Sequence, residues 1–338
     1  MDPKGLSAAA REAAMVSKRL PNTEMSMNKA PVLFISHGAP TFALEPGLLG
    51  PRLTALGERL SEISAVLVVS AHWQTRGVHV MSTAAPETVH DFGGFPAALY
   101  KLQYPAPGAP GLATEAGRLL SEAGFAVRFD DRRGLDHGAW VPLRFLFPRA
   151  NVPVFQVSMP YDLDALGALR LGKALAPLRE RGVMIVGSGS LTHNLYEFRQ
   201  SASPEATYAR EFSDWIRQGV LRGDFNALAR YRQSAPHAER AHPTDDHFLP
   251  LLVAQGASDG SEAVDAIEGG ITHGVLSMDS FAWGLSPGPI TAALAKAFTS
   301  PPREAGPSVP PPRTPAQMAS DGSKRGVDGG FPETIRRA

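Results

Sequence analysis

Apolar residues gather in short continuous runs that alternate with longer amphipathic stretches. Three of the runs, at 32–35, 65–69 and 183–186, are rich in β-branched and aliphatic residues and end in small residues. Such runs are typical of strands that are covered on both faces of a parallel sheet. The wider pattern predicts strands at 32–36, 65–70, 77–82, 153–157, 183–187 and 274–278, and helices near 48–61, 112–123, 163–180, 204–221, 247–255 and 289–298.

Strands that alternate with helices of this length need crossover connections. They therefore predict an α/β fold with a mainly parallel central sheet flanked by helices. Gly182 should end the helix that precedes the third buried strand. A chain of 338 residues, 43% of them hydrophobic, can bury one large core, and we expect a single domain over residues 30–300.

A histidine follows each of the three buried strands. His37 comes directly after the first strand, His72 closely follows the second, and His193 lies a few residues beyond the third. Ligands bind beyond the carboxyl ends of strands in parallel sheets, so these imidazoles should meet in one crevice. A single histidine is more often a hydrogen-bonded structural group than a ligand, but this shared position favours a functional role.

His247 lies in a segment that carries two acidic residues, Asp245 and Asp246. Thr244 is suited to cap a helix whose first turn holds all three, although the aspartates alone would also favour a helix N-terminus. We expect His247 to join His37 and His72 in a metal site assembled from distant segments.

Two further histidines have distinctive neighbours. His137 lies between a carboxylate, Asp136, and a glycine. His90 begins the loop 90–96, which contains two glycines and two phenylalanines and could cover an aromatic substrate.

Composition narrows the chemistry. The chain has no cysteine, which excludes disulfides, thiolate zinc sites, iron–sulfur clusters and a cysteine nucleophile, so any metal must be held by nitrogen and oxygen. A formal net charge of zero argues against binding to nucleic acid or acidic membranes. No apolar stretch approaches the roughly 18 residues that a membrane span needs. We expect a cytoplasmic protein that acts on a small molecule.

The two ends of the chain differ from its middle. Residues 1–29 are polar and lack the continuous hydrophobic segment of a signal peptide, so we expect a flexible N-terminal extension. Residues 301–338 begin with a proline-rich stretch, which predicts a disordered, solvated tail; the alternative is a ligand for a proline-recognising partner.

Six motifs, in this order along the chain, give the sequence a specific resemblance. They are SHGAP (36–40), SAHW (70–73), HDFGGFP (90–96), GLDHGAWVP (134–142), LTHN (191–194) and PTDDH (243–247). The set resembles the DOPA-dioxygenase group of class III extradiol ring-cleaving dioxygenases, across residues 31 to about 285. What this resemblance implies is a single LigB-like α/β domain that opens a catechol ring with O₂ at one non-haem metal ion.

The resemblance also implies roles for individual residues. His37, His72 and His247 match the metal ligands, and His193 matches an acid/base histidine that sometimes lies close enough to be a fourth ligand. His137 is similar to a second pocket histidine that contacts substrate or oxygen. The candidate substrate contacts are His90, Phe92, Phe95 and Trp73.

The residue types are compatible with more than one metal ion. Related protocatechuate-type enzymes carry a glutamate at the position of His247, giving two histidines and one carboxylate, the set expected for Fe(II). Three imidazoles also suit zinc, and Asp245 or Asp246 could supply a carboxylate instead. We expect Fe(II) as the physiological ion, with Zn(II) as the alternative or as the metal found after purification.

Two other functions compete with ring opening. A zinc hydrolase would attack an ester or amide with metal-bound water, but the sequence offers no second metal cluster and no obvious carboxylate base beyond Asp245 and Asp246. A LigB-like binding module without activity would be expected to have lost part of the histidine set, which this chain retains. The expected partners are a catechol and O₂, in a monomer or small homo-oligomer.

Overall fold

The central sheet has six strands in the order β6-β2-β8-β1-β12-β9. The computed structural model describes residues 29–60, 62–199 and 203–285. Four neighbouring strands are parallel: β6 (Val154–Gln156), β2 (Ala65–Ser70), β8 (Val183–Gly189) and β1 (Val32–Ser36). Antiparallel β12 (Ser280–Trp283) and β9 (Val264–Ile267) complete one edge. The mainly parallel sheet that the sequence predicts is therefore confirmed.

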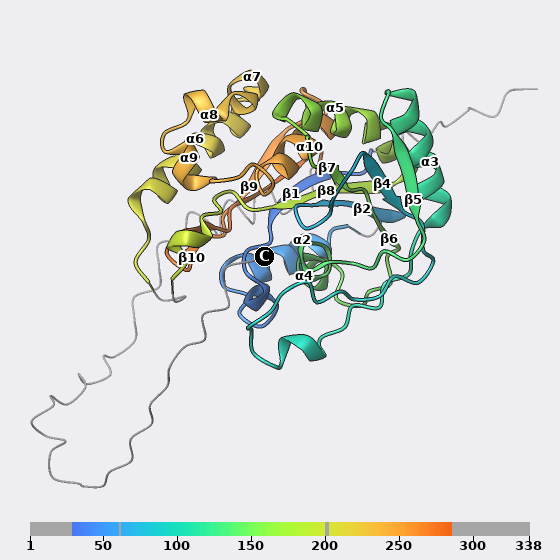
Figure 1. Ribbon diagram of the computed structural model, residues 1–338, viewed down its shortest axis with the longest axis horizontal. Coiled ribbons are helices and arrows are strands. Elements are labelled where there is room, and N and C mark those ends of the chain that lie inside the picture. Colours follow the sequence, from blue (N-terminus) through green and yellow to red (C-terminus); the bar gives the residue numbers. More distant parts are fainter. Residues whose placement is uncertain (1–28, 61, 200–202, 286–338) are drawn as a thin grey trace, which may run out of the picture.

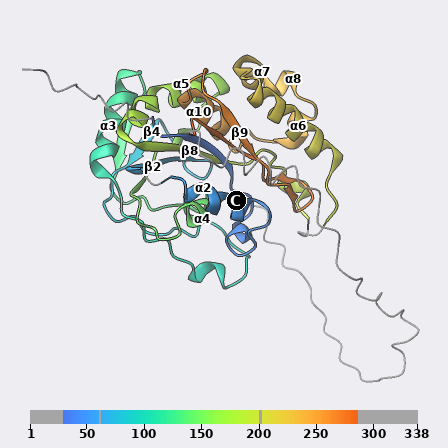
Figure 2. The same ribbon diagram turned by 180° about the vertical axis from the view of Figure 1, so that it is seen from behind.

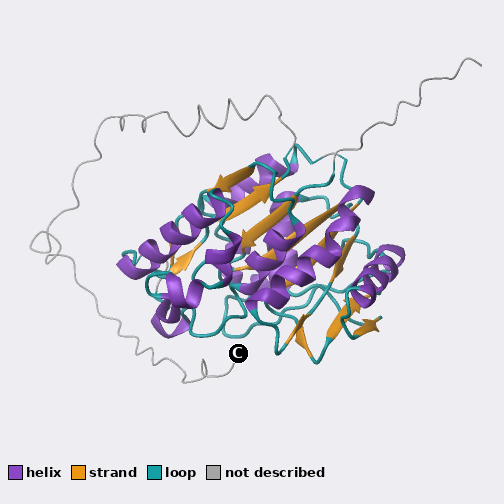
Figure 3. Cartoon of the chain, turned by 90° about the horizontal axis from the view of Figure 1, so that it is seen from above, coloured by secondary structure: helices purple, strands orange, loops and turns teal. Residues whose placement is uncertain are grey.

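Helices cover both faces of this sheet (Figure 1). On one face α10 (Leu249–Ala257) packs against β8 and β1 and against α5 (Ala165–Leu175). On the other face α4 (His137–Leu146) packs against β2 and β8 and against α2 (Leu49–Gly57). Figure 2 shows the same layers from behind, and Figure 3 shows helices lying across the strands.

Small residues allow α10 to lie very close to β8. A Cβ atom on Gly187 would lie 2.0 Å from the backbone oxygen of Pro250, and one on Gly189 would lie 2.2 Å from that of His247. The carboxyl end of β8 is thus pressed against the loop that carries His247.

The other elements surround this core. The helix α3 (Pro110–Glu122) packs against a separate parallel pair, β4 (Val78–Met81) and β5 (Val127–Asp130). Two short pairs are β3 (Gln74–Thr75) with β7 (Met159–Pro160) and β10 (Ile271–Thr272) with β11 (Leu276–Ser277). The remaining helices are α6 (Thr207–Leu221), α7 (Phe225–Ala229), α8 (Tyr231–Ser234) and α9 (Ala238–Ala241), with 3-10 turns η1 (Pro40–Ala43), η2 (Leu99–Lys101), η3 (Ala176–Arg181) and η4 (Leu195–Glu197). Within these described ranges, no helix is long and apolar enough to cross a bilayer.

Several predicted boundaries need correction. The helix expected over 163–180 is α5 continued by η3, because Pro177 lacks the amide hydrogen of a regular turn; it ends at Gly182, where φ is 76°. The strand expected at 274–278 is the β10–β11 hairpin, which turns at His273 and Gly274. The helix expected from 247 begins only at Leu249.

The sequence pattern missed the strands β5, β9 and β12 and the helix α4. It also missed the short elements β3, β7, β10, α7, α8 and α9 and the 3-10 turns η1, η2 and η4. Three expectations lie outside the described residues: the helix at 289–298, residues 1–28 of the N-terminal extension, and the tail at 301–338.

Candidate metal centre and active site

Three imidazoles from distant segments meet at the carboxyl ends of the parallel strands. His37 follows β1, His72 follows β2, and His247 lies in the loop before α10. The Nε2 atom of His72 lies 3.0 Å from Nε2 of His37 and 3.2 Å from Nε2 of His247. Two nitrogens that each lie about 2.0–2.1 Å from one ion are about 2.9–3.4 Å apart at the usual bond angles. Both distances from Nε2 of His72 therefore fit nitrogens that share a metal ion.

Buried hydrogen bonds turn two of these rings in the required direction. Nδ1 of His37 lies 3.0 Å from the hydroxyl of Ser188, which itself donates to the backbone oxygen of Gly138. The hydroxyl hydrogen is thus engaged, so Nδ1 of His37 is the donor to Ser188 and Nε2 keeps its lone pair. Nδ1 of His247 is held in the same way by the carboxylate of Asp246, 2.5 Å away. Such partners on the far nitrogen orient histidines that bind metals.

Burial favours the neutral, ligand-competent form of His37, His72 and His193. Burial first, and then the neighbouring imidazoles, lower the pKa of His37 and of His72 well below the usual value for histidine. The pKa of His193 is lowered mainly by burial and next by the adjacent His247. Metal ligands must be deprotonated, so this environment suits the binding of a cation.

His193 lies flat against His247. Its ring is stacked on that of His247 with the centroids 3.5 Å apart and the planes inclined by 5°. The backbone amide of His193 donates to Ala241, which fixes the loop after β8 beside the 242–247 loop. One ligand atom each of His193, Asp246 and His247 lies within 4.8 Å of the others, so His193 is placed to reach an ion or a molecule bound at the histidines.

The two aspartates near His247 have distinct partners. Asp246 accepts from His247, as described, and although burial raises its pKa, the hydrogen bond and charge of His247 lower it overall. Asp245 accepts from the hydroxyl of Tyr231 and the guanidinium of Arg232. The prediction that all three residues belong to the first turn of a helix is wrong, because α10 starts after them.

His137 lies on the opposite side of the cluster, as the first residue of α4. The helix is capped by the carboxylate of Asp136, which accepts from the amide of Ala139. The ring centroid of His137 is 4.0 Å from that of His72 and 5.3 Å from that of His37. All five sequence-predicted histidines of the centre therefore come together.

Asp91 joins two of these imidazoles, and the sequence reasoning assigned it no role. Its carboxylate accepts from the amide and from Nδ1 of His137, at 2.9 and 3.0 Å, and lies 3.5 Å from Nδ1 of His72. Although burial raises the pKa of Asp91, these hydrogen bonds from His137 lower it overall. The available signal was a carboxylate between His90 and Phe92 in a loop already expected to cover substrate.

Aromatic rings of loop 90–96 form a wall beside His137. The ring of Phe92 meets that of His137 edge-on at 5.6 Å, and Phe95 lies 5.6 Å from Phe92. Tyr100, which was not predicted, adds a ring 5.3 Å from Phe92. His90 contacts Phe92 at 5.7 Å, but its Nε2 lies 3.0 Å from the backbone oxygen of Leu102. Phe92 is thus the predicted contact whose ring meets the histidine cluster, and Phe95 and His90 each pack against Phe92.

Trp73 occupies a different environment. Its side chain is buried, and the guanidinium of Arg133 lies 5.0 Å from the centre of its ring. Arg133 also pairs with Asp136 at 2.8 Å. The ring of Trp73, in the segment that carries His72, therefore packs against Arg133.

The geometry agrees with the known proteins that this sequence resembles. The family described as the catalytic LigB subunit of aromatic ring-opening dioxygenase matches residues 50–276. The chain belongs to this family. The match includes His72, His137, His193 and His247, while His37 precedes it and is placed by its contacts with His72 and Ser188.

Individual relatives support the same membership. The chain is 39% identical over 252 residues to a 4,5-DOPA dioxygenase extradiol of Beta vulgaris, covering 73% of this chain and 94% of the relative. It is 38% identical over 262 residues to the protein of that name from Escherichia coli K12, covering 75% and 94%. The crystal structure of an uncharacterized Escherichia coli K12 protein superimposes with a TM-score of 0.63 at 33% identity, covering 75% of this chain and 99% of that one. The predicted LigB-like fold and extradiol dioxygenase family are confirmed.

Proposed function

We propose that this protein opens the ring of a catechol with O₂, next to the diol, at a non-haem metal ion held by His37, His72 and His247. The observation that carries the proposal is the position of Nε2 of His72, 3.0 Å from Nε2 of His37 and 3.2 Å from Nε2 of His247, in a member of the LigB family. Family membership favours this reaction over the zinc hydrolase and over a binding module without activity.

The donor set fits a divalent ion of the first transition series. Neutral imidazole suits both iron and zinc, and the carboxylate of Asp246, hydrogen-bonded to the far nitrogen of His247, strengthens either site. We propose Fe(II) as the physiological ion, because zinc has no accessible redox change. Zn(II) found after purification would reflect the affinity of the same three imidazoles for zinc. His37, His72 and His247 would hold the ion, which would supply the redox chemistry that couples the catechol to O₂.

The proton chemistry is assigned to two imidazoles. A catechol must lose protons to bind through both oxygens, and His193, stacked on His247 and free of a positive charge at neutral pH, is placed to accept one. His137 is the second proton carrier, oriented by the bonds of Asp91 to its amide and Nδ1. His193 remains a candidate for a fourth ligand.

The substrate is proposed to be a single-ring catechol with a carboxylate-bearing side chain, such as DOPA or a caffeate-like acid. Phe92 and Phe95 would contact its ring, since they form the aromatic wall beside His137. His90 and Trp73 remain predicted contacts; their hydrogen bond and packing suggest that they act by supporting this wall and the His72 segment.

The reaction balances without an external reductant. The ring carbon–carbon bond beside the diol breaks, both atoms of O₂ enter the product, and the product carries an aldehyde and a carboxylate. Anaerobic loading with Fe(II), followed by a catechol and O₂, should give oxygen uptake and a yellow semialdehyde in equal amounts. The Zn(II)-loaded protein should give little of either. If the Fe(II)-loaded protein takes up no oxygen with any catechol of the panel, although bound iron is measured, the proposal is wrong.

The setting of the reaction is also proposed. The partners are a small-molecule catechol and O₂. Neither nucleic acid nor a membrane is a partner, in keeping with the neutral net charge of the chain. The location is cytoplasmic. The assembly is a monomer or small homo-oligomer.

A further inference from the structure

His72 and His137 come from different segments, yet their rings lie close together. His72 follows β2, His137 begins α4, and their ring centroids are 4.0 Å apart. The proposed reaction uses both, since His72 is a proposed metal ligand and His137 a proposed proton carrier. The side chains that join these two segments therefore determine how the two imidazoles face each other.

The side chain of Ser70 holds the backbone of His72. Ser70 is the last residue of β2 and is fully buried. Its hydroxyl accepts from the amide of His72 at 3.2 Å and donates to Oδ1 of Asp136 at 2.7 Å. One hydroxyl thus links the segment of His72 to the residue that directly precedes His137.

The carboxylate of Asp136 accepts hydrogen bonds from three segments. Its side chain is fully buried. Oδ1 accepts from Ser70 and, at 3.2 Å, from the amide of Ala139 in the first turn of α4, while Oδ2 accepts from Nη2 of Arg133 at 2.8 Å. Hydrogen bonds to an ionised acceptor are stronger than neutral ones, so this carboxylate holds the end of β2 against the start of α4.

Arg133 reaches the other polar atom of the His72 backbone. The Nη2 atom that donates to Asp136 also lies 3.4 Å from the backbone oxygen of His72. The amide and the carbonyl of His72 are therefore both bound by side chains that meet at Asp136. A displacement of Asp136 would reach His72 through both.

Close packing at Gly138 strengthens this link. A Cβ atom on Gly138 would lie 2.4 Å from the hydroxyl oxygen of Ser70 and 3.2 Å from Cδ2 of His72. The first turn of α4 thus lies directly against both groups. Tightly packed groups transmit a displacement because no empty space absorbs it.

We infer that Ser70 and Asp136 are positioning residues that set His72 and His137 relative to each other. They act through the backbone of His72 and the first turn of α4, whereas Asp91 bonds to the ring of His137. The inference rests on the proposed function for the roles of the two histidines. It adds two residues that support the site without serving as ligands.

Titration of the metal-free protein with Co(II) tests the inference without ring opening. The affinity for Co(II) and its visible absorption both depend on the number and geometry of the ligands. Ser70→Ala and Asp136→Asn should each weaken Co(II) binding about 10- to 100-fold, the usual scale for groups that orient a metal ligand. The absorption of the fully loaded variants should also differ from that of the unsubstituted protein. A role in folding alone would lower the resistance to urea and leave this absorption unchanged.

The two substitutions disturb different parts of the link. Ser70→Ala removes both hydrogen bonds of the hydroxyl. Asp136→Asn keeps an oxygen that can accept from Ser70, but it loses the negative charge and places an amide nitrogen, which is a donor, where Arg133 needs an acceptor. Both changes loosen the backbone of His72, so both should act in the same direction.

Arg133→Lys decides the question if the buried variants fail to fold. The side chain of Arg133 is 21% exposed, and a lysine keeps the positive charge beside Asp136 but lacks the planar guanidinium. We expect Co(II) binding to weaken about two- to tenfold, at the lower end of the same scale, with a changed absorption. An Arg133→Lys protein with unchanged affinity and absorption would contradict the inference.

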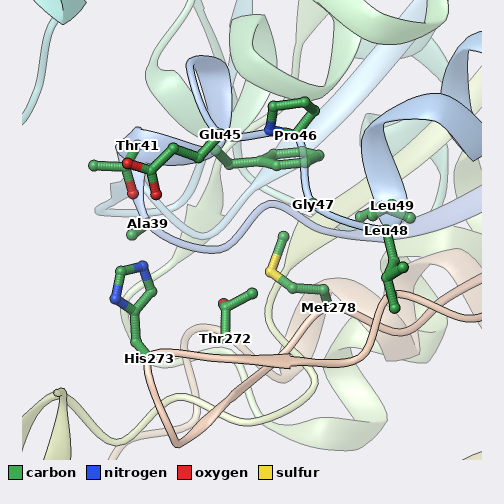
Figure 4. Close-up of a pocket in the computed structure, with 12 residues that line it drawn as sticks. Ala39, Thr41, Glu45, Pro46, Gly47, Leu48, Leu49, Thr272, His273 and Met278 are labelled. Carbon is green, nitrogen blue, oxygen red and sulfur yellow. The ribbon is translucent and has the colours of Figure 1, made fainter. Parts of the chain in front are cut away.

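Two control variants remove a hydroxyl outside this set of bonds. Ser64 is exposed and lies directly before β2. Thr41 follows His37 by four residues and lines a separate pocket (Figure 4). Ser64→Ala and Thr41→Val should both keep the affinity and the absorption of the unsubstituted protein. A Ser70→Ala protein that equals these controls in both measurements overturns the inference.

Oxygen uptake separates this inference from the proposed function. If the Fe(II)-loaded protein opens no catechol, while Ser70→Ala and Asp136→Asn still alter Co(II) binding, the proposed function is wrong and the positioning role is supported. If catechols are opened, but both variants bind Co(II) with the affinity and absorption of the controls, only the positioning inference is wrong.

Discussion

The two sides of the candidate active site are held in place by different means. On the strand-end side, His37 is only 1% exposed, follows a fully buried strand and is tied through Ser188 to both β8 and α4. On the other side, loop 90–96 is largely exposed, and a side chain on Gly93 or Gly94 would meet open space. Asp91 is the residue of this loop that bonds to the cluster.

This difference teaches which properties the fold fixes and which it leaves adjustable. The positions of the Nε2 atoms follow from the register of packed strands, where a small displacement would disturb many buried contacts. The aromatic wall is held by one carboxylate and by contacts among the half-buried rings of Phe92 and Phe95 and the exposed ring of Tyr100. We therefore expect the largest effects of substitution at the strand ends and smaller effects toward the loop.

The largest effect is expected for His37→Ala and His72→Ala. Each removes one of three imidazoles, so metal retention and ring opening should both be lost. Metal content by mass spectrometry and oxygen uptake measure the two losses. His79→Ala, on β4, is the control and should keep both; a His37→Ala or His72→Ala protein with full metal and full activity would remove that residue from the ligand set.

His193→Ala should have the next largest effect, because its imidazole is assigned to proton transfer. We expect kcat to fall by about 10²–10⁴ while much of the metal is retained. Single-turnover kinetics together with metal analysis test this. Loss of metal as complete as in His37→Ala would instead identify His193 as a fourth ligand and add it to the strand-end side of the site.

A pH dependence of stability should also arise on the buried side. Burial lowers the pKa of His242 to about 4, with its Nε2 donating to the backbone of Leu191. Below the usual value near 6.5 the unfolded chain takes up a proton at His242 that the folded protein resists. The contribution of His242 to stability is therefore fully present above pH 6.5 and falls by about 3 kcal/mol toward pH 4.

Urea unfolding of the metal-free protein between pH 7 and pH 4 measures this slope. His242→Gln removes the titrating ring, so the variant should lose less stability over this range than the unsubstituted protein. Equal slopes in the two proteins would show that His242 is not protonated on unfolding in this range.

The smallest of these effects is expected for Asp91→Asn, which tests the connection between the two sides. An asparagine keeps one oxygen that can accept from His137, but it loses the negative charge beside Nδ1 of His137 and the second carboxylate oxygen that lies 3.5 Å from Nδ1 of His72, so we expect kcat to fall about 10- to 100-fold with most of the metal kept. Asp131→Asn, in the exposed turn after β5, is the matched control. A kcat equal to that of the control would mean that loop 90–96 is positioned without Asp91.

The buried side of the molecule could be predicted from sequence because its signals are local. Four to six consecutive aliphatic residues identify β1, β2 and β8, and the strand-end rule then brings His37, His72 and His193 together without any alignment. The three-dimensional neighbours of these rings could not be predicted in this way. Ser188 and Asp91 are common polar residues, and only the folded chain shows which nitrogen each contacts.

The missed elements have physical reasons. The helix α4 contains Pro142 and has Gly138 in its first turn, and both residues lower helical propensity. The helix forms nevertheless, because Asp136 caps it and its burial in the core stabilises it. β12 is short, and its antiparallel pairing with β1 depends on contacts between residues about 250 positions apart. Local patterns carry no information about such pairings.

The hydroxyl of Ser188 has a consequence for protein design. It accepts from His37 while donating to Gly138, so one atom joins a proposed metal ligand, a strand and a helix. Grafting the three imidazoles alone onto another parallel sheet would leave His37 free to rotate and offer either nitrogen. A transplanted centre needs this serine, and the helix turn that engages its hydrogen, as part of the graft.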